Sequence, residues 1–257
     1  MNTHTLSRQT LFDTLHRSAS RHPEKLALRQ GGRDLSYREF RDLCLSVAGS
    51  LAHMGIQPGD RGAILSRNSI DFAAVRYAVA AIGAILVPVN FMLNVRETAY
   101  ILGHSGARLL CVGATEGDKA VAAAAECPDI EQLVWLAGGN ASDTPAGMIP
   151  FGDLCSGGHY TDNPGIDANA PAQIIYTSGT ESAPKGAVLS HAAILWQYSA
   201  CSTRRSPRKT PPCTPCPCST APSSIVSSGL HSRPVAAISL PMTTHRPTCC
   251  ACWRTSR

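Results

Sequence analysis

The chain is poor in aromatic residues and has no long, unbroken hydrophobic run. Aromatics make up 5% of its 257 residues, yet a hydrophobic fraction of 44% excludes a chain that is disordered throughout. The longest mostly apolar stretch, residues 72–91, is interrupted by Arg76, Pro88 and Asn90, so we expect no membrane span. Residues 1–15 lack an apolar segment behind a basic flank, which argues against a secretory leader and predicts a cytoplasmic protein.

Acidic residues are absent beyond Glu181. Residues 1–200 hold 15 Lys plus Arg and all 18 acidic residues, whereas residues 201–257 hold 8 basic residues and no acidic one. The formal net charge of +5 therefore belongs to the final segment, and it does not indicate a nucleic-acid partner for the whole protein. We accordingly divide the chain into a folded domain at 1–200 and a basic, Cys- and Pro-rich tail at 201–257, which we expect to be unstructured.

Familiar catalytic motifs are also missing. No G-x-G-x-x-G is present, and residues 103–107 lack the second glycine of a nucleophile elbow, so Ser105 and Gly106 are interpreted as a helix end. The wide spacing of the four cysteines in the first 200 residues predicts reduced, mostly buried thiols: Cys44, Cys111, Cys127 and Cys155.

What the first 200 residues do contain is a regular alternation of helical and strand patterns. Short, uniformly apolar strands between helices are typical of a parallel sheet covered on both faces, so we predict an α/β fold. Residues 138–170 are rich in Gly, Asp, Asn and Pro and are expected to form a loop. The expected helices lie within residues 11–20, 40–54, 72–82, 97–102 and 119–125, and the expected strands within 26–28, 63–65, 85–89, 109–112 and 133–135.

Several helix ends are marked by capping residues. Ser36 and Glu39 have the spacing of a capping box, in which each side chain binds the other residue's backbone N–H. Gly55 suits the left-handed position after the same helix, and Asn68 is predicted to cap the next one.

One segment, residues 174–191, carries the chemistry of a phosphate-binding loop. An apolar strand leads into a loop that is dense in hydroxyls, glycine and one lysine, and a second apolar strand follows. Backbone N–H groups near Gly179 and Gly186 and the Lys185 ammonium could bind polyphosphate. The Walker pattern is not met, because Lys185 precedes Gly186. On spacing alone, a polar surface hairpin with a solvated lysine is an equally good interpretation.

The segment resembles the phosphate loop of the AMP-forming, adenylate-forming superfamily of acyl-CoA synthetases, luciferases and peptide-synthetase adenylation domains. Residues 176–180 and 184–186 match its usual pattern, Tyr-Thr-Ser-Gly-Thr-Thr-Gly-x-Pro-Lys-Gly. Glu181 and Ser182 stand where Thr-Gly is commoner, and they resemble a variant of bacterial fatty acyl-CoA synthetases. The resemblance extends over about residues 10–199, with further landmarks at 22–28, 35–39, 55–61, 84–90 and 95–107.

The resemblance implies a ligase that activates a carboxylic acid, here a fatty acid, as acyl-AMP and transfers it to coenzyme A. ATP, Mg²⁺ and coenzyme A would be its small-molecule partners, with no resident metal. It also implies that Tyr176 anchors a strand end and that His191 caps a helix rather than acting as a base. The implied ATP phosphate-binding residues are Thr177, Ser178, Gly179, Thr180, Glu181, Ser182, Lys185 and Gly186.

Members of this superfamily are roughly twice as long as this chain. The segments that bind adenine and ribose and the small domain with the catalytic lysine are not found in the sequence, so no catalytic set is complete. We therefore expect a truncated synthetase that is inactive by itself. The alternative is a non-catalytic nucleotide-binding or interaction module with a genuine basic tail.

The tail itself has several interpretations. Its Cys and His residues partly meet zinc-ligand spacing, but prolines separate some of them and no fold surrounds them: Cys213, Cys216, Cys218, His231, His245, Cys249, Cys250 and Cys252. A disulfide framework would need a secreted protein. We favour an out-of-frame stretch that follows a frameshift. In the frame offset by two bases, Cys249-Cys250 and Cys252-Trp253 must each encode a leucine, and residues 212–223 permit an aromatic-His segment that resembles the superfamily's next landmark.

Overall fold

The computed structural model describes residues 9–136, 144–156, 158–161, 165–177 and 183–203. The prediction of an unstructured tail therefore concerns residues that lie almost entirely outside the described part, and so do the alternatives for its cysteines. In the described part, no helix has the length and hydropathy needed to cross a membrane.

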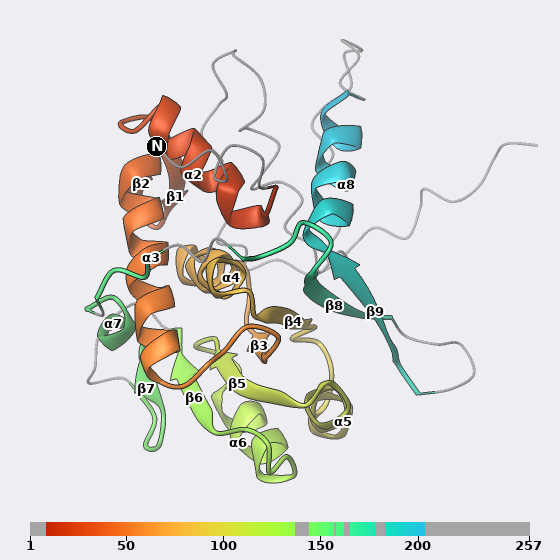
Figure 1. The fold of residues 1–257 in the computed structure, drawn as a ribbon. Coiled ribbons are helices and arrows are strands. Elements are labelled where there is room, and N and C mark those ends of the chain that lie inside the picture. Colours follow the sequence, from red (N-terminus) through yellow and green to blue (C-terminus); the bar gives the residue numbers. More distant parts are fainter. Residues whose placement is uncertain (1–8, 137–143, 157, 162–164, 178–182, 204–257) are drawn as a thin grey trace, which may run out of the picture.

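The centre of the domain is a seven-stranded sheet (Figure 1). All neighbouring strands are parallel except β8 and β9, which are antiparallel. From one side of the sheet to the other, the strands are β7 (Ile149–Pro150), β6 (Gln132–Trp135), β5 (Ala107–Val112), β3 (Arg61–Leu65), β4 (Ile85–Val89), β8 (Pro171–Thr177) and β9 (Lys185–Ser190).

Helices cover both faces of this sheet (Figure 1). On one face lie α2 (Leu11–Arg21), α3 (Tyr37–His53) and α4 (Ile70–Ile82), and on the other lie α5 (Val95–Ser105) and α6 (Gly117–Ala125). Alternate residues of a strand point into two separate hydrophobic cores, one on each face of the sheet. Ile64 belongs to the core under α2, α3 and α4, and Ala63 and Leu65 belong to the core under α5 and α6. The predicted α/β fold with a covered parallel sheet is confirmed.

The order of the strands creates a switch point between the carboxyl ends of the neighbouring strands β3 and β5. The connection after β3 runs through α4 on one face to β4, whereas the connection after β5 runs through α6 on the opposite face to β6, on the other side of the sheet. Ligands of open α/β sheets bind beside such a point. Because β8 pairs with β4, the carboxyl end of β8 at Thr177 lies at the same edge of the sheet.

A small second sheet lies outside the main one. The expected strand at 26–28 is β1 (Leu26–Gln30), which pairs with β2 (Arg33–Ser36) in an antiparallel hairpin rather than joining the parallel sheet. Gly31 and Gly32 form its turn with φ of 55° and 83°, values that other residues rarely adopt.

Most helix ends agree with the sequence, and two predictions are wrong. The Ser36 and Glu39 capping box forms, and Gly55 has a φ of 86°. Asn68 is not the cap of α4, because the Ser69 hydroxyl accepts the hydrogen bond from Phe72 N at 2.9 Å. The segment 138–170 is not all loop, since it contains β7 and a short helix, α7 (Phe151–Leu154).

Candidate functional site

The candidate site begins where β8 ends. Thr177 and Lys185 are partners in the antiparallel register of β8 and β9, so the connecting segment leaves and returns at neighbouring positions. This places the ends of the predicted phosphate loop at the ligand-binding edge of the sheet. Of the predicted site residues, Thr177, Lys185 and Gly186 are described, while Ser178, Gly179, Thr180, Glu181 and Ser182 lie outside the described residues.

The ammonium group of Lys185 is exposed and has no carboxylate partner among the described residues. Lys119 differs, because its Nζ donates to Glu116 Oε2 at 2.8 Å and to the carbonyl oxygen of Phe91 at 2.5 Å. A cation without a described carboxylate partner, next to the exposed Thr177, is a suitable group for neutralising a bound anion.

Gly186 lies inside β9, not in the loop, and packing explains why it is glycine. A Cβ at this position would lie 2.9 Å from Ile174 Cγ2 and 3.1 Å from Tyr176 Cζ, both on the neighbouring strand β8. Real Cβ atoms essentially never come within 3.0 Å, so any other residue would force a shift at Ile174 and would also crowd the Tyr176 ring. The sequence could not indicate this role, because it depends on which residue of β8 faces Gly186.

Tyr176 links β8 to helix α5. Its hydroxyl lies 2.7 Å from Nδ1 of His104, and the two rings meet edge to face with centroids 5.7 Å apart. Partial burial raises the pKa of the Tyr176 phenol, so this group stays protonated at neutral pH. Tyr176 thus anchors the end of the strand, in agreement with the role that the resemblance implied.

His191 is a structural residue at the start of α8 (His191–Thr203). Its ring is fully buried, and Nδ1 accepts a hydrogen bond from Leu11 N at 3.2 Å, which ties α8 to α2. Burial lowers the pKa of His191 to about 4, so the imidazole is neutral at pH 7. A buried neutral ring that already accepts a bond is consistent with capping and not with a general base.

Sequence reasoning missed a second group of residues at the same edge of the sheet. The Arg67 guanidinium lies over the Phe91 ring, 4.5 Å from its centroid, and so joins the segments that follow β3 and β4. A Cβ at Gly113, which follows β5, would lie 2.5 Å from Ser66 Oγ. These segments are therefore closely packed, and their long-range contacts give no periodic pattern that a sequence could reveal.

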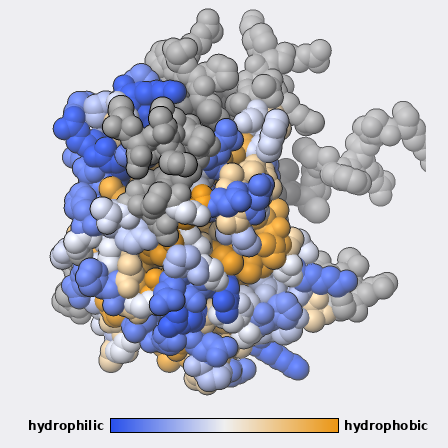
Figure 2. All heavy atoms as spheres, in the orientation of Figure 1, coloured by the Kyte–Doolittle hydropathy of each residue, from blue (hydrophilic) through white to orange (hydrophobic). Residues whose placement is uncertain are grey.

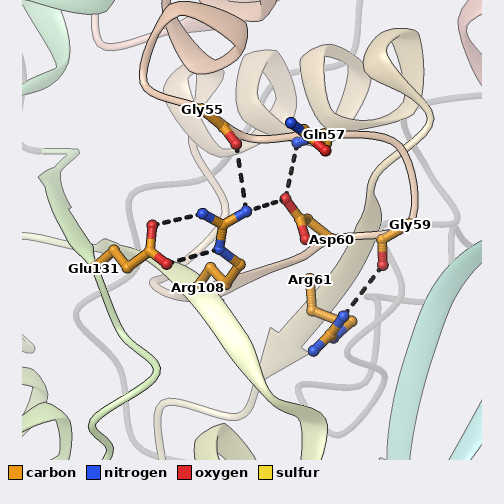
Figure 3. A network of polar contacts seen from close by, with 7 residues as sticks. All are labelled: Gly55, Gln57, Gly59, Asp60, Arg61, Arg108 and Glu131. Carbon is orange, nitrogen blue, oxygen red and sulfur yellow. Dashed lines mark hydrogen bonds and ion pairs between the residues drawn. The ribbon is translucent and has the colours of Figure 1, made fainter.

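The opposite edge of the sheet holds a polar network in which Arg108 is paired with Glu131 and Asp60 (Figure 3). Arg108, near the start of β5, donates to both carboxylate oxygens of Glu131, at 2.9 and 2.7 Å, and to Asp60 at 2.5 Å. Asp60 in turn accepts from Gln57 N at 2.8 Å. Hydrogen bonds and charge raise the pKa of Arg108 and lower that of Glu131. With its charges satisfied internally, this network stabilises the start of the strands rather than forming a binding site.

Comparison with known proteins places these features in a family. Residues 15–232 match the family described as "AMP-binding enzyme". A feruloyl-CoA synthase of Amycolatopsis is 33% identical over 180 residues, which cover 70% of this chain and 33% of that protein. The long-chain-fatty-acid–CoA ligase FadD13 of Mycobacterium tuberculosis is 30% identical over 173 residues, 66% of this chain and 31% of that protein. The chain thus spans about one third of the length of these curated relatives.

Solved structures agree with this assignment. The N-terminal domain of FACL13 from Mycobacterium tuberculosis superposes with a TM-score of 0.71 at 25% identity, and the match covers 90% of this chain and 57% of that one. The family match spans more than half of the chain, and the covered parallel sheet is shared with that domain. This chain therefore belongs to the AMP-binding enzyme family.

Proposed function

We propose that this chain supplies the N-terminal, phosphate-binding part of an AMP-forming acid–thiol ligase whose substrate is a fatty acid. The observation that carries the proposal is the position of Thr177 and Lys185. They are paired at the end of β8, at the ligand-binding edge of the sheet, and no described carboxylate neutralises the lysine. The curated relatives include ligases for fatty acids and for feruloyl groups, which supports an acid substrate.

The proposed chemistry has two steps. A carboxylate oxygen attacks the α-phosphorus of ATP, the bond to the bridging oxygen breaks, and pyrophosphate leaves. A thiol, that of coenzyme A, then attacks the acyl carbon and releases AMP. Lys185 would offset the charge on the β- and γ-phosphates as pyrophosphate departs, and the Thr177 hydroxyl would donate to a phosphate oxygen.

The remaining phosphate contacts are assigned to the loop that the sequence identified. Ser178, Gly179, Thr180, Glu181 and Ser182 connect the two described residues, and their backbone N–H groups and hydroxyls suit phosphate oxygens. Within the described residues, no group of three or more His, Cys, Asp or Glu side chains could hold a metal ion. The family resemblance implies Mg-ATP, so Mg²⁺ is proposed as part of the substrate. No described residue is assigned to coenzyme A.

We further infer that residues 1–200 do not complete the reaction alone. The chain corresponds to about one third of the curated relatives, and hydrophobic residues gather on the surface where α8 meets the β8–β9 hairpin (Figure 2). Val188 on β9 and Trp196 on α8 are 59% and 76% exposed. Such surfaces normally pack against other structure, so low solubility and no ATP–pyrophosphate exchange are expected. Exchange at ordinary enzyme rates with any of a panel of fatty acids would contradict the inferred inactivity.

Calorimetric titration with pyrophosphate and with Mg-ATP tests the phosphate site directly. Lys185→Ala should weaken binding by roughly 1–3 kcal/mol, the value of a charge-assisted contact. Lys25→Ala removes a partly buried lysine just before β1 and serves as the control. Equal affinities of the two variants would mean that Lys185 is an ordinary solvated surface residue.

The frameshift remains a separate proposal about the tail. Residues 201–257 combine 8 basic residues with no acidic one, an imbalance that the rest of the chain lacks. Sequencing the gene from the Trp196 codon onward tests it, with the aromatic-His segment expected in the second frame. Early stop codons in that frame would instead favour the alternative function, a nucleotide-binding or interaction module with a genuine basic tail.

A further inference from the structure

We propose that His104 is a positioning residue for the phosphate site: through Tyr176, it holds the paired strand ends that carry Thr177 and Lys185. The inference rests on the proposed function for its purpose, but the mechanical link can be tested without a nucleotide. His104 belongs to α5 and is 72 residues away from Tyr176 in the sequence.

Three rings connect the helix to the hairpin. Tyr100 and His104, one turn apart on α5, stack with centroids 5.4 Å apart and an interplanar angle of 27°. His104 then meets Tyr176 nearly at a right angle, 85°, and its Nδ1 lies 2.7 Å from the tyrosine hydroxyl. Both contacts restrict the imidazole. Helix α5 therefore fixes the ring that contacts Tyr176 on β8.

Tyr176 belongs to β8 and its ring packs against β9, so a fixed ring restricts both strands. It lies opposite Gly186 in the register, and the absence of a side chain there lets the ring lie against β9. The next pair along the hairpin, Thr177 with Lys185, is the last pair of the described register. A shift of the Tyr176 ring would therefore displace the two described residues proposed to contact phosphate.

A simpler role for His104 must be separated from this one. It lies in the last turn of α5, where a basic side chain stabilises a helix through its dipole. His53 has that position in α3, where its Nδ1 lies 2.9 Å from the carbonyl oxygen of Gly49, four residues earlier in the same helix. His53→Ala is therefore the matched control for the loss of a histidine from the end of a helix.

The test measures amide hydrogen exchange of residues 171–177 and 185–190 in the intact chain without nucleotide. His104→Ala and Tyr176→Phe should each speed exchange near Thr177 and Lys185 by about five- to tenfold, the effect of one lost hydrogen bond. The double variant should add little to Tyr176→Phe, because that variant already lacks the hydroxyl that His104 contacts. His104→Asn, whose amide can replace the lost polar contact, should restore part of the protection.

Pyrophosphate titration of the same variants gives the functional readout. His104→Ala should weaken binding about fivefold, while His53→Ala should not change it. If the hairpin exchanges equally in His104→Ala and His53→Ala, the inference is wrong, even where the wild type binds pyrophosphate. If hairpin protection falls as expected but no wild-type affinity for pyrophosphate exists, the proposed function fails and the positioning link stands.

Discussion

The two edges of the parallel sheet use charged side chains in opposite ways. At the amino edge, Arg108 is bonded to both Glu131 and Asp60, so each charge has a partner inside the fold. At the carboxyl edge, the β8–β9 hairpin presents Lys185 without a described carboxylate partner. Paired charges stabilise strand ends without binding a ligand, whereas an unpaired cation beside hydroxyls is available to an anion. Stability and function are therefore expected to separate between the two edges.

The largest effect is expected from His191, which follows β9 at the amino edge. Its pKa is about 4 in the folded protein against 6.5 for an unperturbed histidine, so the unfolded chain binds more protons between these values. The free energy of unfolding should therefore fall as pH decreases from 6.5 to 4, by up to roughly 3 kcal/mol. Urea unfolding across this pH range measures the slope.

His191→Asn is the control for that slope. The Asn side-chain oxygen can still accept from Leu11 N, but it does not titrate, so this contribution should disappear. Pyrophosphate affinity above pH 6.5 should be unchanged in the variant. A slope that survives the substitution would assign the pH dependence to other groups.

Lys185→Ala should have the next largest effect. Unlike the titration of His191, it should change ligand affinity and leave stability unchanged. Pyrophosphate binding should weaken by roughly 1–3 kcal/mol, while the unfolding midpoint stays within error of the wild type, because the ammonium has no described partner in the fold. Measuring pyrophosphate affinity and the unfolding midpoint on one preparation distinguishes a binding role of the carboxyl edge from a stabilising role. A clear loss of stability would show that Lys185 has a structural role.

Gly186→Ala tests whether the hairpin depends on close packing. The added Cβ would meet Ile174 and Tyr176, so we expect a loss of about 1–2 kcal/mol in stability together with weaker pyrophosphate binding. Gly158→Ala is the matched control, because no atom lies within 4 Å of the position of its added Cβ. Similar stability of the two variants would remove the packing explanation for Gly186.

Arg108→Ala should have the smallest effect, because its network is partly exposed to solvent. Loss of Arg108 returns the pKa of Glu131 toward its ordinary value. The lowered folded pKa of Glu131 adds stability above the unfolded pKa, and this stability is lost as pH falls through the folded value. Thermal unfolding should therefore show Arg108→Ala to be less stable than the wild type at pH 7, with a smaller difference at acidic pH. Phosphate binding should be unaffected.

Much of the fold was predictable because its information is local. The apolar strands and the amphipathic helices were found from periodicity, and the Ser36 and Glu39 capping box was found from spacing. The prediction that Asn68 caps α4 was wrong, because two adjacent residues can both cap a helix. A distant group helps to decide between them. The Gln30 side chain of β1 accepts from Ile70 N at 2.7 Å, which helps fix the start of α4 just after Ser69.

The sequence by itself determined the α/β class and the order of most elements, and it predicted the stretch of chain that we propose binds phosphate. These follow from hydrophobic periodicity and from residue chemistry within a few positions. Only the tertiary structure decided that β1 lies outside the main sheet, that Gly186 makes room for Tyr176, and that His104 contacts Tyr176. Each of these depends on strand register or on a contact between distant residues, and a backbone pattern that repeats every two or 3.6 residues carries no information about either.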